Sequence, residues 1–232
     1  MESSQGTRPL LNAALLGAVI REKKAAPQKD IVRQGQIPQV AHLLMAGHTC
    51  RYRMLGDGSR QITAILVPGD ICDLEAALGG RANYGVAALT HCTVGEIPLH
   101  MIANPAANDH GIAEAIWSNL LRDEAIAREW MVGLGRRPAL QRMAHLFCEL
   151  RVRLRHVGLA IDDAFDMRVT QSELADVLGL SYVHVNRVLQ ELRRGGLIRM
   201  SGGVLAILDV ARLEQMADFD PSYLRSTFSR AA

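Results

Sequence analysis

The sequence predicts an α+β fold, in which a strand-rich N-terminal part is followed by one long helix and a smaller helical part. Three observations predict it. Short apolar or alternating runs separated by glycine and proline fill residues 31–98, a proline-free helical stretch covers residues 109–134, and two short helical patterns meet at Gly179. We therefore expect three units, namely residues 10–108, residues 109–135 and residues 136–222.

Composition and charge narrow the class of protein. The chain has 232 residues, of which 49% are hydrophobic, as expected for a globular protein with room for two modest cores. The formal net charge is only +2, although the residues from Arg136 onward hold a mild basic excess. The apolar run near the N-terminus is too short to span a bilayer and lacks a basic lead-in, so we expect a cytoplasmic protein without a membrane partner.

The cysteines and histidines show no pattern of a metal site. The four cysteines are far apart and form no C-x-x-C pair: Cys50, Cys72, Cys92 and Cys148. We expect free thiols in a reducing compartment. The sequence also has no glycine-rich phosphate loop and no credible nucleophile–base pair, so we expect no catalytic residue, no metal ligand and no enzyme.

Residues 31–98 read as an antiparallel barrel or roll. The short strand-like runs end at regular turn signals, which is typical of many short antiparallel strands. The segment at residues 53–60, with Gly56, Asp57 and Gly58 at its centre, predicts the tip of a hairpin.

The stretch at residues 109–134 carries an apolar stripe that Asp123 interrupts. Its members recur at helical spacing: Ile112, Ile116, Leu120, Ala127, Trp130 and Leu134. Such a helix either packs on the strand-rich part of its own chain or pairs with a second copy as a coiled coil. Gly135 and Pro138 then predict a hinge before a second helix that ends near His156.

Residues 170–198 have the sequence TQSELADVLGLSYVHVNRVLQELRRGGLI, which predicts two helices around Gly179. Thr170 and Glu173 have the spacing of a capping box. Gly179 permits a left-handed turn, and Ser181 suits the N-cap of the second helix.

The second of these helices has two faces. Val185, Leu189 and Leu192 share the face that we expect to be buried, whereas the opposite face carries polar side chains that include Asn186 and Arg187. An exposed helix of this kind fits the major groove of DNA, where arginine pairs with guanine and asparagine with adenine. By spacing alone, the alternative is an ordinary helical hairpin with solvated arginines.

The segments around this pair of helices are a predicted loop at residues 158–167, a predicted hairpin at residues 199–208 and a short C-terminal tail. Arginines near the helix end and on the hairpin would supply attraction to phosphates, which does not depend on sequence. We predict the following DNA contacts: Thr170, Gln171, Ser181, Tyr182, Val183, His184, Asn186, Arg187, Gln190, Arg193, Arg194 and Arg199.

The segment at residues 170–198 resembles the winged helix-turn-helix of the Crp/Fnr transcription regulators. Residues 66–78, LVPGDICDLEAAL, resemble a turn in the cyclic-nucleotide-binding-type β-roll of that family. The resemblance implies an antiparallel β-roll of the jelly-roll type as sensor domain, then a dimerisation helix that uses the apolar stripe and Asp123, then a winged helix-turn-helix domain. It also implies a homodimer on near-palindromic double-stranded DNA, most often an activator, with RNA polymerase as a further partner.

Carried onto this chain, the resemblance gives roles to residues of the second helix. Arg187 matches the arginine that family members place on a guanine. Tyr182 and Val183 stand where better-known members have charged readers, so we expect Val183 to contact a thymine methyl and Tyr182 a phosphate. His184 either donates to a base or phosphate or is a solvated surface residue.

The resemblance also places a ligand pocket in the roll, at Gly69, Asp70, Cys72, Asp73, Leu74, Arg81, Tyr84, Ala127 and Arg128. Cys72 stands where the nucleotide readers of the family have glycine, Tyr84 where they have a phosphate-binding arginine, and residues 127–128 where they have Thr-Ser. We therefore expect no cyclic nucleotide, although Asp73 would reach a ribose hydroxyl and Arg81 would serve if its loop were shifted.

The cysteines and histidines also bear on three other kinds of effector, namely an iron–sulfur cluster, haem and a redox change. We expect no iron–sulfur cluster, because the Fnr-type cluster needs closely spaced N-terminal cysteines and the first cysteine here is Cys50. The sequence leaves open haem ligation by one histidine, with these candidates: His42, His48, His91 and His100. Cys72 is either a redox-sensitive thiol or a small buried filler. The alternative function is thus a sensor in which a small ligand, a redox change or haem gates DNA binding through the roll.

Overall fold

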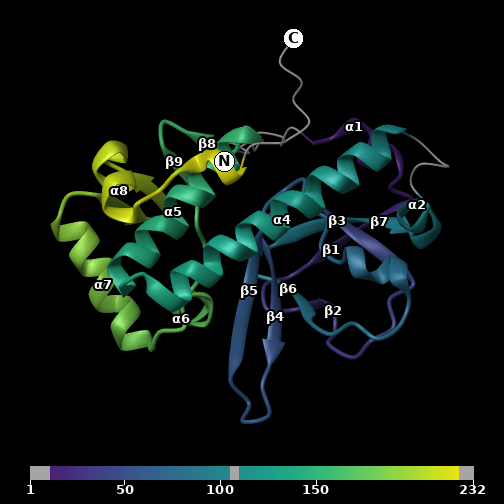
Figure 1. Ribbon diagram of the computed structural model, residues 1–232, viewed down its shortest axis with the longest axis horizontal. Helices are drawn as coiled ribbons and strands as arrows, with labels where there is room; N and C mark the ends of the chain where they lie inside the picture. The colour runs from purple at the N-terminus through teal and green to yellow at the C-terminus, as the bar shows by residue number, and fades with distance from the viewer. Residues whose placement is uncertain (1–10, 105–109, 225–232) are drawn as a thin grey trace, which may run out of the picture.

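The structure is a computed structural model that describes residues 11–104 and 110–224. The boundaries predicted at residues 10 and 109 lie outside the described residues. An N-terminal roll, the long helix α4 (His110–Arg136) and a C-terminal helical domain follow one another in the predicted order (Figure 1).

The roll consists of two antiparallel sheets. One has three strands in the order β1 (Arg21–Ala25), β7 (Cys92–Pro98) and β3 (Val40–Ala46). The other has four strands in the order β2 (Asp30–Val32), β6 (Gly85–Ala88), β4 (Thr49–Met54) and β5 (Arg60–Leu66). Apolar side chains from both sheets and from the turn after β5 form a buried cluster: Ile31, Val32, Leu44, Leu66, Cys72, Val86, Ala88, Cys92 and Val94. The predicted antiparallel roll is confirmed, and its β4–β5 hairpin projects from the molecule with the predicted tip (Figure 1).

Short helices and the N-terminal half of α4 cover the outside of the three-stranded sheet. The short helices are α1 (Ala13–Gly17), η1 (Leu74–Leu78) and α2 (Leu99–Ala103). Ile112 and Ile116 of α4 share a buried cluster with Leu15, Leu43 and Ile97. This half of α4 is therefore part of the core of its own chain.

As far as residue 224, the C-terminal domain contains four helices, a 3-10 turn and a small sheet. The helices are α5 (Ala139–His156), α6 (Gln171–Leu178), α7 (Tyr182–Arg194) and α8 (Val210–Ala217), and the turn is η2 (Pro221–Leu224). The sheet has the order β10 (Ile198–Ser201), β11 (Val204–Ile207), β9 (Ala164–Asp166) and β8 (Ala160–Ile161).

Two expectations for this domain were wrong. The predicted loop at residues 158–167 contains the β8–β9 hairpin, because Asp162 and Asp163 adopt φ angles of 48° and 60° that a tight hairpin turn requires. The predicted short tail contains α8, whose N-cap Asp209 accepts a hydrogen bond from the backbone of Arg212.

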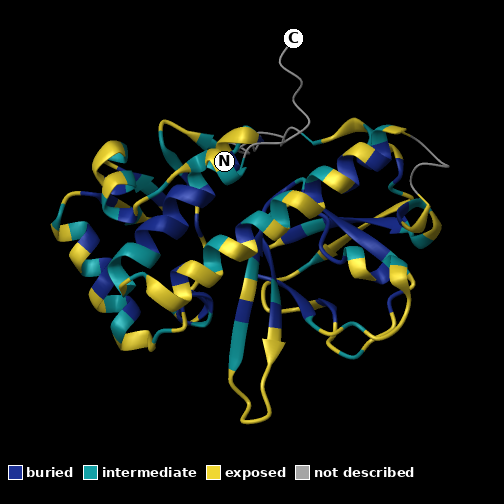
Figure 2. Cartoon of the chain, viewed as in Figure 1, coloured by how far each residue is buried: buried dark blue, intermediate teal, exposed yellow. Residues whose placement is uncertain are grey.

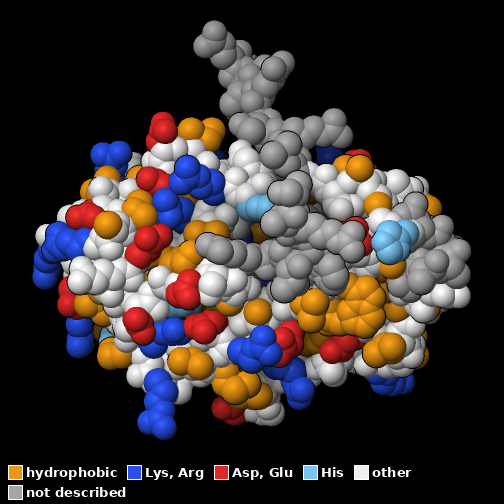
Figure 3. Space-filling view, turned by 45° about the horizontal axis from the view of Figure 1, so that its top comes forward, with side chains coloured by type: hydrophobic (Ala, Val, Ile, Leu, Met, Phe, Trp, Pro, Cys, Tyr) orange, Lys and Arg blue, Asp and Glu red, His pale blue; other side chains and the backbone are white. Residues whose placement is uncertain are grey.

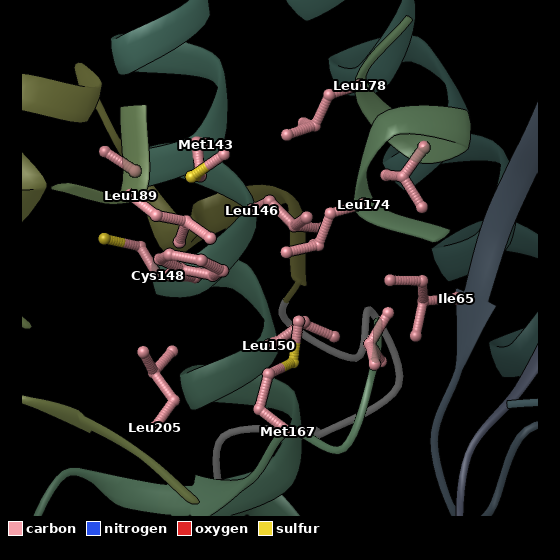
Figure 4. Packing of buried hydrophobic residues seen from close by; sticks show 14 of the residues in the cluster. Ile65, Met143, Leu146, Cys148, Leu150, Met167, Leu174, Leu178, Leu189 and Leu205 are labelled. Atoms are coloured by element: carbon pink, nitrogen blue, oxygen red, sulfur yellow. The ribbon is translucent and has the colours of Figure 1, made fainter. Parts of the chain in front are cut away.

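One hydrophobic cluster joins the roll to the C-terminal domain. In Figure 4, Ile65 of β5 points toward Leu174 of α6, and both side chains are at most 1% exposed. Leu178 of α6 belongs to the same buried cluster. Arg60 of β5 also forms an ion pair with Asp176 of α6 at 2.7 Å. Burial of each large side chain contributes about 1.5–3 kcal/mol, so the roll holds α6 in one orientation.

The described residues include no helix that is long and apolar enough to cross a membrane.

Candidate nucleic-acid interface

The predicted capping and turn residues fix α6 and α7 in place. Oγ1 of Thr170 accepts a hydrogen bond from the amide of Glu173 at 3.2 Å, and Oε2 of Glu173 accepts one from the amide of Thr170 at 2.7 Å. Gly179 adopts a φ of 60° between the helices, and Oγ of Ser181 caps α7 by accepting from the amide of His184. The capping box, the glycine turn and the second N-cap are all confirmed.

Helix α7 is strongly two-faced, as predicted. Val185, Leu189 and Leu192 are at most 1% exposed, and Val188, which the sequence analysis did not single out, is also buried. Six residues of the opposite face line one open surface hollow of about 400 Å³: Tyr182, Val183, Asn186, Arg187, Gln190 and Arg194. This face points away from the rest of the molecule (Figures 1 and 2), so a groove of DNA can reach it.

Two side chains on this face differ in their freedom. Arg187 is exposed and has no hydrogen bond or ion pair with any residue that the structure describes. Nδ2 of Asn186 donates to Oε1 of Gln171 at 3.1 Å, which links α7 to α6. Arg187 is therefore free to turn both nitrogen donors toward a base, whereas Asn186 is held by its neighbour. His184 is partly buried at the edge of the same face.

Further arginines surround this face. Arg194 and Arg199 are exposed, and Arg193 is partly buried. Arg168, which is not among the predicted contacts, has a 66% exposed side chain just before α6. The turn of the β10–β11 hairpin lies against it, since a Cβ on Gly203 would be 2.6 Å from Cγ of Arg168. The sequence feature that could have indicated it is a basic residue two positions before Thr170, the N-cap of α6.

The acidic residues of the predicted ligand pocket are already paired. Asp70 is buried, with Oδ2 at 2.6 Å from Arg153 and Oδ1 at 3.3 Å from Arg122. Although burial alone would raise the pKa of Asp70, the two arginines hold it below its usual value. Asp73 is also buried, and it accepts from the backbone of His42 at 2.7 Å and lies 2.8 Å from its Nδ1. The carboxylate that was expected to reach a ribose hydroxyl is therefore engaged by His42 in this structure.

Of the other predicted pocket residues, some line the roll and some do not. Gly69 lies in a turn with φ of 98°, and Leu74 is partly buried. Arg81 is exposed and donates to the carbonyl of Gly35 at 3.0 Å. The last two residues lie on the exposed side of α4, where Arg128 pairs with Glu124 of the same helix: Ala127 and Arg128.

Cys72 and Tyr84 do lie in the roll. Sγ of Cys72 is fully buried 3.8 Å from Oγ1 of Thr49, and burial raises the pKa of this thiol well above its usual value. Of the two roles considered, a small buried filler fits and a reactive thiolate does not. The ring of Tyr84 lies 5.9 Å from the guanidinium of Arg51, a residue that the sequence analysis did not single out.

The histidine candidates are scattered. His42 is engaged by Asp73, His48 is buried with its pKa lowered to about 4 by desolvation, and His91 and His100 are exposed. Within the described ranges, no three His, Cys, Asp or Glu side chains form a group suited to a metal ion.

The predicted stripe on α4 divides between two faces of the helix. Leu120, Ala127 and Leu134 are exposed, as a surface for a second copy requires. The other four are used within the chain, which corrects the prediction. Ile112 and Ile116 pack in the roll. Asp123 pairs with Arg51 at 2.7 Å, and Nε1 of Trp130 donates to buried Glu149 at 3.0 Å. None of these four residues lies on the exposed face of the helix.

The exposed face has its own apolar repeat. Trp117 and Met131, which are 54% and 72% exposed, alternate with residues of the predicted stripe. At spacings of three and four, the exposed series runs Trp117, Leu120, Glu124, Ala127, Met131 and Leu134. We call these six residues the α4 seam. In Figure 3, hydrophobic side chains gather on the side of the molecule that α4 crosses, with charged groups between them.

Comparisons with known proteins agree with this arrangement. A family model described as Crp-like helix-turn-helix domain matches residues 141–216, and one described as cyclic nucleotide-binding domain matches residues 22–108. The nitrogen fixation regulation protein FixK of Bradyrhizobium diazoefficiens is 32% identical over 172 residues, which cover 72% of this chain and 69% of that protein. The transcriptional activator protein FnrL of Cereibacter sphaeroides is 30% identical over 173 residues, covering 71% and 67%. The structure of FixK2 from Bradyrhizobium japonicum has the same fold, with a TM-score of 0.75 at 24% identity, covering 84% of this chain and 96% of that one.

Proposed function

Since this chain belongs to the Crp/Fnr family of DNA-binding transcription regulators, we propose that it acts as a homodimer that binds a near-palindromic DNA site and activates transcription. Activation is the function in the names of several relatives, FnrL among them. We further propose that it works in the cytoplasm through contact with RNA polymerase, without catalytic activity of its own. Transcription regulators of this family are generally not enzymes.

The observation that carries the proposal is the face of α7 around Arg187. An unpaired guanidinium on an exposed helix is suited to bidentate hydrogen bonds with O6 and N7 of guanine. The neighbouring Val183 is 68% exposed and Tyr182 57%, so an apolar contact and a hydroxyl lie beside it. We infer a site that keeps a guanine contact and reads its flanking bases through shape and a thymine methyl rather than through charge.

The α4 seam supports dimerisation. Its alternating spacing of three and four is that of the a and d positions of a coiled coil, and most of its members are apolar although exposed. Pairing of two such helices would bury this surface. A twofold dimer then presents two α7 helices to half-sites about one helical turn of DNA apart, which is why a near-palindrome is expected.

The roll interior supports regulation without a cyclic nucleotide. Asp70 and Asp73 are paired with protein groups, and a phosphate-binding arginine is lacking at Tyr84. A nucleotide would have to displace these buried pairs, each at a cost that free ligand does not easily offset.

Selection of binding sites from random duplex DNA tests the proposal. We expect a two-fold symmetric consensus, and Arg187→Ala should weaken binding to it by about 1–3 kcal/mol with relaxed preference at one base. Arg212→Ala, which removes an exposed arginine from α8, is the matched control and should bind normally. Recovery of no consensus, or equal binding by Arg187→Ala, contradicts the proposed recognition.

Sedimentation of a second pair of variants tests the dimer. Leu120→Glu places a charge in the α4 seam and should give monomers, whereas Ile161→Glu makes the same kind of change on the exposed β8 strand and should leave dimers. A dimeric Leu120→Glu protein would show that the seam is not the interface.

A further inference from the structure

A guanidinium group lies inside the roll next to α4. Arg51 extends from β4, and its Nη2 donates to Oδ2 of Asp123 on α4 at 2.7 Å. The same side chain donates to the carbonyl of Ile71 from Nη2 at 2.7 Å and to that of Cys72 from Nε at 2.8 Å. The side chains of Arg51 and Asp123 are only 14% and 16% exposed. One side chain thus connects a sheet, the turn after β5 and the long helix.

This guanidinium occupies the place where the family resemblance predicted a ligand. Cys72 and Tyr84, two of the predicted pocket residues, lie directly against Arg51. Its partner Asp123 is the α4 residue that reaches this place, with its side chain only 16% exposed. A ligand in this position would have to bridge the sheet and the helix, and Arg51 already makes that bridge.

The ion pair between Arg51 and Asp123 is costly to break. Burial alone would lower the pKa of Arg51, but Asp123 raises it above its usual value, so the guanidinium stays charged. An anionic ligand that took over Arg51 would leave the carboxylate of Asp123 shielded and unpaired, which is strongly unfavourable. The pocket is therefore selective against the ligands that the family resemblance suggested.

The bridge also bears on DNA binding through α4. Asp123 faces the roll while the α4 seam is exposed on the same helix, so a bond to Asp123 fixes how the helix is rotated. The helix continues to Arg136 and then, after a short connection, into α5, which packs with α6 and α7. Its rotation sets the position of two DNA-reading helices in a dimer.

We propose that Arg51 and Asp123 act as a built-in substitute for an effector: they fill the ligand position of the roll, exclude cyclic nucleotides and hold α4 in the DNA-binding arrangement without any ligand. This rests on the proposed function of the chain as a dimeric DNA-binding regulator. Arg51 and Asp123 are positioning residues, since they act on DNA through α4 and touch no DNA themselves.

The test measures DNA affinity and thermal unfolding of the full chain with Arg51→Ala and Asp123→Asn. Each should weaken binding to the selected site roughly tenfold, within the usual range of coupling between two sites. Arg53→Ala, which removes an exposed arginine of the same strand, is the matched control and should bind as the wild type does. Asp123→Asn keeps the shape of the side chain, so it tests the bridge even if Arg51→Ala is too unstable to purify.

Chemical rescue separates the bridge from a general loss of stability. Methylguanidinium should raise the melting temperature and restore DNA affinity of Arg51→Ala, but not of the double variant that also carries Asp123→Asn, with sodium chloride at equal ionic strength as reference. Cyclic AMP and cyclic GMP should change neither quantity for the wild type.

Three results would overturn the inference: unchanged DNA affinity in Arg51→Ala and Asp123→Asn, rescue that persists in the double variant, or a response of the wild type to either nucleotide. A wild-type protein that binds no selected DNA would instead refute the proposed function, so the two failures are distinguishable.

Discussion

Replacement of Arg153 by methionine is the most informative test of how the roll and the DNA-binding domain are held together. Arg153 of α5 is 5% exposed and lies between two buried carboxylates. Its Nη2 is 2.6 Å from Asp70, and its Nη1 is 3.1 Å from Glu149 and 3.0 Å from the carbonyl of Ile65 on β5. Loss of one partner of a buried ion pair typically costs about 3–5 kcal/mol, and we expect a loss of that size in the free energy of unfolding.

Asp70 and Glu149 respond differently to the loss of Arg153, and this difference makes the stability of the variant depend on pH. Without Arg153, Asp70 keeps Arg122, whereas among the described residues Glu149 keeps only the neutral donors Trp130 and Tyr223, each at 3.0 Å. Burial already raises the pKa of Glu149 in the folded wild type, and removal of the arginine raises it further. A raised folded pKa means stability that is present at low pH and lost as pH rises through it, so the penalty of Arg153→Met should shrink as pH is lowered.

Urea unfolding followed by circular dichroism at about pH 7.5 and about pH 5.5 measures both effects. Arg155→Met, two residues along the same helix with a 68% exposed side chain, is the control and should change stability by less than about 0.5 kcal/mol. Adding Glu149→Gln to Arg153→Met should recover part of the loss at the higher pH. A penalty below about 1 kcal/mol, or one that is equal at the two pH values, would refute the account of the buried network.

Three further predictions concern DNA contact, acid stability and the helix cap. Arg194→Ala should weaken binding to all DNA sequences alike and reduce the slope of log K against log salt by about 0.9; a loss limited to one sequence would contradict a phosphate contact. His48 and His145 are held neutral because burial lowers the pKa of each to about 4, so the free energy of unfolding should be full above about pH 6.5 and fall as pH drops toward 4. His48→Gln should flatten part of that fall in urea titrations, and an unchanged profile would show that this histidine is not responsible. Thr170→Ala should lower stability by about 1 kcal/mol in thermal unfolding while Thr170→Ser keeps most of it, and equal losses in the two would argue against the cap.

The helix-turn-helix could be predicted because its signals are local. The cap at Thr170, the turn at Gly179 and the two faces of α7 depend on residues within a few positions of one another, where backbone geometry alone decides which side chains meet. Arg187 was placed correctly on the exposed face for this reason. Arg168 was missed because its proximity to the wing depends on Gly203, far along the chain.

The long helix shows the opposite case. Its sequence contains apolar residues on more than one side. The hydrophobic periodicity therefore predicted a helix but did not indicate which side of it the roll would cover. The prediction combined Ile116, which packs in the roll, with Leu120, which is exposed one turn later. Trp117 and Met131 were left out although they are among the most exposed apolar residues of the helix.

Taken alone, the sequence determined the order of the three parts, the positions of most helices and which face of α7 is exposed, because these follow from short-range periodicity and capping. Only the tertiary structure decided what fills the roll and which face of α4 is free. Arg51 and Asp123 are 72 positions apart, and Asp70 and Arg153 are 83 apart. Pairs of this kind carry no spacing signal, since they form only when distant segments pack together and desolvation makes an unpaired charge too costly.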